Sequence, residues 1–63
     1  MLEHALLREQ FEELLAQERQ ALAACEGLLE KLEDPELRSQ VEQLRREKQR
    51  HVDLTERLLE IVD

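Results

Sequence analysis

A regular spacing of apolar residues, broken once, constrains the fold of this chain more than any other feature. From Leu7 to Leu32 apolar residues recur in alternating steps of four and three, and the same spacing returns in the second half. Such steps place residues along one side of an α-helix. Between the two runs stands Asp34-Pro35, where Asp34 can cap a helix and Pro35 suits the first helical position. The sequence therefore predicts two helices joined by a tight turn.

The predicted limits are a first helix over residues 2–32, a turn over 33–35 and a second helix over 36–62, all in one domain. A connection this short makes the helices antiparallel. The composition agrees, because 40% of the residues are charged, 41% are hydrophobic and Phe11 is the only aromatic. That balance is typical of long helices and excludes a β-fold. We expect an all-α antiparallel helical hairpin.

The same spacing predicts which side chains line each helix. In the first helix the predicted line is Leu7, Phe11, Leu14, Glu18, Ala21, Cys25, Leu28 and Leu32, and in the second it is Leu37, Val41, Leu44, Lys48, His51, Thr55, Leu58 and Val62. Further apolar residues broaden these lines, namely Leu15, Leu22, Leu29, Val52, Leu54, Leu59 and Ile61. The resulting apolar face is wider than one partner helix can cover.

A chain of 63 residues is also too small to be stable on a single helix pair without further support. Its single cysteine excludes an internal disulfide. We therefore expect two copies, or a larger number, to associate, with two copies forming a four-helix bundle. The residues expected at the oligomer interface are Leu7, Phe11, Leu14, Leu15, Ala21, Leu22, Leu28, Leu29, Val41, Leu44, Leu54 and Leu58.

Polar residues interrupt the apolar lines at one level. Glu18 and Lys48 lie equally far from a turn centred near Glu33, and His51 and Thr55 follow along the second helix. Buried charges need partners. One interpretation is a buried polar network of Glu18, Lys48, His51 and Thr55 that fixes register. The other is a metal site in which Glu18 and His51 of two copies bind iron or manganese. The Lys48 ammonium would repel such a cation, which favours the network.

Two segments, EDPELR at residues 33–38 and REKQRH at residues 46–51, resemble the second helix of ferritin-like proteins. The similarity is greatest to rubrerythrin-type proteins and short encapsulated ferritins, and it covers about two-thirds of the chain. It implies two-helix chains that dimerise, and it implies iron(II) oxidation at a site matching Glu18 and His51. The family has a glutamate where this chain has Lys48, so the resemblance supports the fold more than the iron chemistry.

Charge narrows the range of functions. The net charge of −7 argues against nucleic acid as a partner. No apolar run reaches the length of a membrane span, and a lone cysteine fits a cytoplasmic protein. We expect a self-associating structural or protein-interaction module without catalytic residues or an organic cofactor. The alternatives are an iron- or manganese-binding ferroxidase that uses Glu18 and His51, and an adaptor or chaperone that binds another protein's helix.

Overall fold

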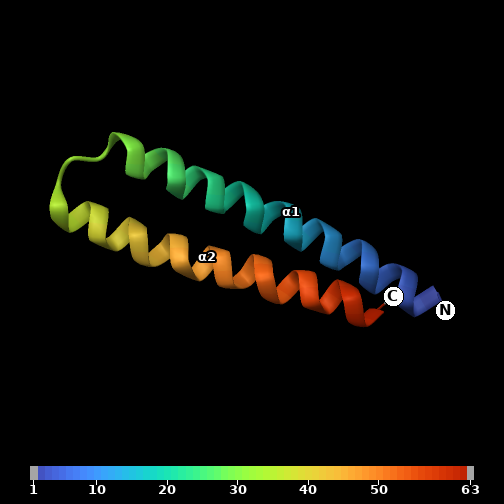
Figure 1. The fold of residues 1–63 in the computed structure, drawn as a ribbon. Coiled ribbons are helices and arrows are strands. Elements are labelled where there is room, and N and C mark those ends of the chain that lie inside the picture. The colour runs from blue at the N-terminus through green and yellow to red at the C-terminus, as the bar shows by residue number, and fades with distance from the viewer. Residues whose placement is uncertain (1, 63) are drawn as a thin grey trace.

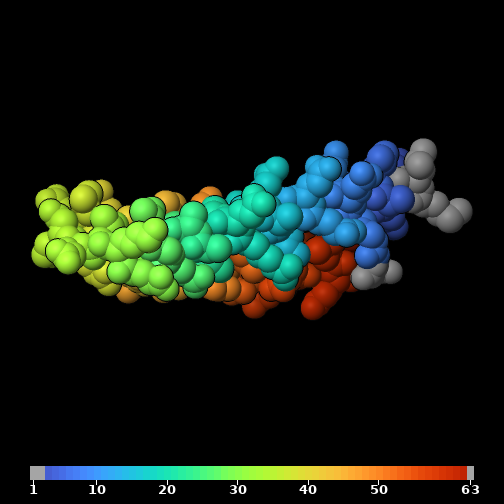
Figure 2. Space-filling model, turned by 90° about the horizontal axis from the view of Figure 1, so that it is seen from above, coloured from blue at the N-terminus to red at the C-terminus, as the bar shows by residue number. Residues whose placement is uncertain are grey.

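The computed structural model describes residues 2–62, and these form a helical hairpin (Figure 1). Helix α1 runs over Leu2–Lys31 and helix α2 over Pro35–Val62, and no strand occurs among the described residues. The two helices lie side by side and antiparallel, with the turn at one end and the chain ends at the other. The molecule is a narrow rod with extents of 50 × 13 × 11 Å (Figure 2).

The start of α2 follows from its capping residue. Oδ1 of Asp34 accepts hydrogen bonds from the backbone N–H of Glu36 at 2.9 Å and of Leu37 at 3.0 Å. Pro35 occupies the first helical position, where its missing N–H costs no hydrogen bond. The helix therefore begins one residue earlier than we predicted.

The end of α1 is closed by an arginine of α2. The Arg38 guanidinium donates to the carbonyl oxygen of Leu32 at 2.9 Å and also to that of Leu29. The Leu29 carbonyl belongs to the last turn of α1 and the Leu32 carbonyl to the residue just after it, where acceptors lack partners within the helix. Arg38 thereby satisfies them and places a cation at the negative end of the helix dipole. Helix α1 ends one residue before the predicted limit.

The contact between the helices, which we call the seam, is rotated from the predicted line. Its buried and half-buried positions are Phe11, Leu15, Glu18, Leu22, Cys25 and Leu29 on α1, Leu32 just after it, and Val41, Arg45, Lys48, Val52, Thr55, Leu59 and Val62 on α2. Of the other members of the predicted line, Ala21, His51 and Leu58 are half-buried, and Leu7, Leu14, Leu28, Leu37 and Leu44 are exposed in the hairpin.

On α1 two largely apolar lines flank the line through Phe11 and Cys25, whereas on α2 the buried flank contains Arg45 beside Val52 and Leu59. On α1 the line through Phe11 and Cys25 belongs to both interpretations, and periodicity does not decide between the flank with Leu14 and the flank with Leu15. The hairpin buries the flank with Leu15. That flank begins with Arg8 and continues with Leu22 and Leu29, whereas the flank with Leu14 contains Ala21, which offers less surface to bury than Leu22 does.

The core that results is small. Among the described residues Leu15, Cys25 and Val52 are the buried apolar side chains, and Thr55 is the buried polar one. The chain exposes 5098 Å². A compact monomer of this mass exposes about 4,250 Å². The hairpin therefore leaves about 850 Å² more surface in contact with water than a folded protein of its size usually does.

Candidate functional site

One ion pair shows how the two sides of the hairpin differ. Nη2 of Arg19 lies 3.0 Å from Oε2 of Glu56. Arg19 follows Glu18 and Glu56 follows Thr55, and both Glu18 and Thr55 are seam positions. Successive helical residues are rotated by about 100° about the helix axis. Residues such as Arg19 and Glu56, which directly follow seam positions, therefore lie on one side of the two packed helices. The residues just before seam positions therefore lie on the opposite side.

Along this opposite side, next to the seam, runs a mostly apolar row at seven-residue spacing, and we call it the open face. It consists of Leu7, Leu14, Ala21 and Leu28 on α1 and of Leu37, Leu44, His51 and Leu58 on α2. Five of its six leucines are exposed. Soluble proteins rarely leave a continuous apolar patch of this kind in water unless another surface covers it. The open face is the first part of the candidate site.

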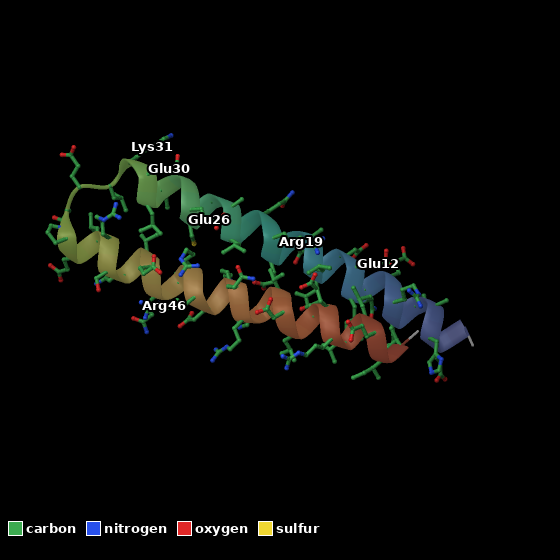
Figure 3. The ribbon with its side chains drawn as sticks, viewed as in Figure 1. Glu12, Arg19, Glu26, Glu30, Lys31 and Arg46 are labelled. Atoms are coloured by element: carbon green, nitrogen blue, oxygen red, sulfur yellow. The ribbon has the colours of Figure 1, made fainter. Side chains whose placement is uncertain are left out.

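The other side of the hairpin is polar. Glu12, Arg19 and Glu26 follow one another along α1 (Figure 3). The matching positions of α2 are Glu42, Gln49 and Glu56, and these are polar as well. In Figure 3, Lys31 and Arg46 extend away from the pair on the outer sides of their helices. The rod therefore has a mostly apolar side and a polar side.

Glu42 is the carboxylate on the polar side with the strongest contacts. Its Oε1 lies 2.6 Å from Nη2 of Arg45 and 3.6 Å from Nε of Arg46. The hydrogen bond from Arg45 holds the pKa of Glu42 below its usual value, and the same bond raises the pKa of Arg45. Glu42, Arg45 and Arg46 are all on α2, so these ion pairs stabilise that helix, and Glu26 of α1 adds a smaller contribution to the raised pKa of Arg45.

The second part of the candidate site is an ion-pair cluster of Glu18, Lys48 and His51. Oε2 of Glu18 lies 3.3 Å from Nζ of Lys48 and 3.4 Å from Nδ1 of His51. The side chains are 15%, 25% and 41% exposed in the order Glu18, Lys48, His51. Glu18 and Lys48 lie in the seam, while His51 lies on the open face. The cluster thus joins the interior of the hairpin to its uncovered side.

The carboxylate of Glu18 is incompletely satisfied. Its Oε2 is shielded from solvent and accepts no hydrogen bond from the described residues, although two nitrogens lie near it. A buried acceptor without a hydrogen bond is costly. Thr55, which we expected in this network, instead donates its hydroxyl to the carbonyl oxygen of His51 at 2.7 Å, within its own helix. Thr55 is therefore satisfied separately.

Metal ligation would use Glu18 and His51, the two donors that face each other. No three His, Cys, Asp or Glu side chains gather at one point among the described residues. A metal site built on Glu18 and His51 would thus take further donors from a second copy. Nζ of Lys48 lies 3.3 Å from the same carboxylate oxygen that a metal would need. Cys25 is buried in the seam, 4% exposed, and lies outside this group.

The expected interface residues divide into two groups. Leu15 is buried within the hairpin, so it is not a surface residue, and Phe11, Leu22, Leu29 and Val41 are half-buried in the seam. The other members stay on the surface as exposed or half-buried side chains: Leu7, Leu14, Ala21, Leu28, Leu44, Leu54 and Leu58. Leu54 and exposed Ile61 lie about one turn on either side of Leu58.

Sequence reasoning missed three arginine contacts. These are the cap of α1 by Arg38, the Arg19–Glu56 pair and the seam position of Arg45. The spacing could have indicated the seam position of Arg45, because Arg45 stands four residues after Val41 and three before Lys48. Its long aliphatic stem can line an apolar contact while its charge reaches the surface.

Comparison of the chain with models of protein families, with curated proteins and with solved structures finds no match. Neither α1 nor α2 is both long enough and apolar enough to cross a lipid bilayer. The ferritin-like resemblance stays a prediction from the sequence. Function is therefore argued from the open face and the ion-pair cluster.

Proposed function

We propose that this chain is a self-associating helical module, whose open face takes a second copy of itself to complete a four-helix bundle. The observation that carries the proposal is the row of exposed leucines at seven-residue spacing on both helices, among them Leu7, Leu14 and Leu28 on α1 and Leu37 and Leu44 on α2. Apolar residues at this spacing pack against other helices that have the same repeat. The bundle serves as a structural or protein-interaction unit.

A second copy suits the open face better than a single foreign helix does. The face spans both helices, so it offers room for two partner helices, and a second hairpin brings two with the same seven-residue spacing. A stable interface of ordinary size buries about 800 Å² on each partner.

The ion-pair cluster then acts as a device for register and partner choice. Covering the open face removes water from His51, which already lies 3.4 Å from the carboxylate of Glu18. Buried polar groups that satisfy one another only in the correct arrangement disfavour slipped or foreign pairings. On this account Glu18, Lys48 and His51 contribute specificity, and no chemical step is assigned to them.

The proposal is tested by placing charge on the open face. Leu14→Glu should convert the dimer to a monomer in analytical ultracentrifugation, because a carboxylate would be buried in the interface. Leu6→Glu is the matched control, since Leu6 is also an exposed leucine of α1 but lies outside the open face. The control should stay dimeric. Equal behaviour of the two variants would contradict the proposal.

Metal binding is the second candidate, and one observation favours it. Oε2 of Glu18 lacks a hydrogen bond and faces Nδ1 of His51. Two copies would supply two carboxylates and two imidazoles. Manganese(II) added to the purified protein should then raise its melting temperature, because a ligand bound only by the folded form stabilises it. Glu18→Gln should abolish that rise. A melting temperature indifferent to manganese, iron and chelator would exclude this candidate.

A further inference from the structure

The seam contains charged residues where a pair of helices gains most from apolar ones. Arg45, Lys48 and Thr55 occupy seam positions on α2, and Glu18 stands among the seam residues of α1. The side chains of Lys48 and Glu18 are 25% and 15% exposed, so this ion pair is only partly removed from water. An ion pair in such a site is a weak source of stability. The middle of the seam therefore holds the two helices together weakly.

The leucines of α2 lie mostly outside the seam. Leu59 is a seam residue, whereas Leu37, Leu44, Leu54 and Leu58 lie on or beside the open face. In the hairpin Leu37 is 49% exposed, Leu44 43% and Leu54 53%. Removing a leucine side chain from water is one of the larger contributions that a residue makes to folding. Much of what α2 can contribute is therefore realised only when another surface covers it.

The interior that one hairpin builds is correspondingly thin. Leu15, Cys25 and Val52 are its buried apolar side chains, and no large side chain in the described part of the chain is fully buried. The Arg19–Glu56 pair that joins the helices is about half exposed on both sides and adds little. Helices without tertiary packing are marginal in water. A single hairpin has little besides helix propensity to oppose the entropy of ordering the chain.

We infer that the chain folds only as it associates, because the charged seam leaves one hairpin short of stability and the leucines of the open face complete the core only against a second copy. This inference rests on the proposed self-association and adds a regulation to it. The unpaired chain is largely unfolded and open to proteolysis. The folded fraction rises with chain concentration by mass action.

Dilution of the natural chain tests this coupling. Circular dichroism and sedimentation equilibrium are measured on the same samples, and the helical signal should fall in step with the fraction of dimer. A helical signal that persists after the mass has fallen to that of one chain overturns the inference and leaves the self-association standing. A chain that is monomeric at every concentration overturns the self-association as well.

Urea unfolding replaces dilution where the dimer is too tight to dissociate in buffer alone. When folding and association are one step, helix and dimer are lost in a single transition whose urea midpoint rises with chain concentration. A midpoint that is indifferent to chain concentration would overturn the inference. So would a dimer that urea first separates into helical single chains.

The role of the charged seam is tested in a chain that does not pair. Leu14→Glu should lose at least about half of the helical signal, since a weakly packed helix pair is marginal, whereas Leu6→Glu should keep it. Adding Glu18→Leu, Arg45→Leu and Lys48→Leu to the Leu14→Glu chain should restore the signal in a particle of one chain mass. A Leu14→Glu chain as helical as the natural one overturns the inference, and so does a fourfold variant that regains no helix.

Three other leucines supply the matched control in the same Leu14→Glu chain, namely Gln20→Leu, Gln43→Leu and Arg50→Leu. Each of these exposed positions lies two residues from a seam position and thus on the outer side of its helix. The control leucines add apolar surface without filling the seam, so this chain should stay largely unfolded. Equal recovery of helix in the two sets would show that leucine content decides the folding, and would overturn the inference.

Discussion

The carboxylate of Glu18 stands between the ammonium of Lys48 and the imidazole of His51 without accepting a hydrogen bond from the described residues. An ion pair of this kind is weak evidence for stability, since removing both charges can be neutral while removing one is costly. Its three members come from two helices and two different surfaces, the seam and the open face. The cluster therefore links the fold of one chain to the covering of its apolar side.

A double-mutant cycle tests this interpretation of the pair. Lys48→Met should lower the free energy of unfolding by about 1–2 kcal/mol, because it leaves the Glu18 carboxylate without its main counter-charge in a site that is only partly shielded. Adding Glu18→Leu should recover most of that loss. Urea denaturation at one fixed protein concentration measures both effects. A double variant no more stable than Lys48→Met would show that the charges are not coupled.

Glu42 supplies a prediction about acid. Its pKa is lowered mainly by the hydrogen bond from Arg45, so its contribution to stability is present above the ordinary carboxyl pKa and is lost as the pH falls through the lowered value, below 4.5. Arg45→Gln should return the pKa of Glu42 toward 4.5, as followed by carbon NMR of the carboxyl group. Arg46→Gln is the control, because Arg46 lies farther away, at 3.6 Å, and should shift the pKa less.

At the scale of the helices, the sequence predicted the number, order and direction of the elements, and their limits to within one residue. The start of α2 could be predicted from Asp34 and Pro35, because a capping residue and a proline determine a helix start through local chemistry alone. Glu18 and Lys48 were predicted to lie close together because they are equally far from the turn, and their side chains are in contact. Both features depend only on residues near the turn or on counting from it.

The rotation of each helix about its own axis could not be predicted from periodicity. The lines through Leu14 and through Leu15 are both apolar at seven-residue spacing, and they are separated by one residue. Which line faces α2 depends on the total area buried against the other helix, and that is a property of the packed pair. The same ambiguity explains why Arg45 was missed, since an arginine in a seam carries no apolar signal.

Gly27 gives a test within α1. It lies inside the helix, and a Cβ added there would meet no atom within 4 Å. Gly27→Ala should therefore raise the free energy of unfolding by about 1 kcal/mol, through helix propensity alone. Ala24→Gly, at an exposed position of the same helix, should lower it by a similar amount. Loss of stability in Gly27→Ala would mean that the backbone at this position approaches another surface in the assembled protein.

For the whole molecule, the question is what covers the open face. The single hairpin buries three apolar side chains among its described residues and leaves leucines exposed from one end of the rod to the other. On the proposed self-association, a second copy would convert that exposed row into a core. A foreign helix would cover only part of the face, since the face spans both α1 and α2.

The mass of the natural chain in solution tests the central claim most directly. Sedimentation equilibrium at micromolar concentration, with circular dichroism on the same sample, should give a helical particle of twice the 7.5 kDa chain mass. A fully helical, cooperatively unfolding particle of 7.5 kDa would contradict the account.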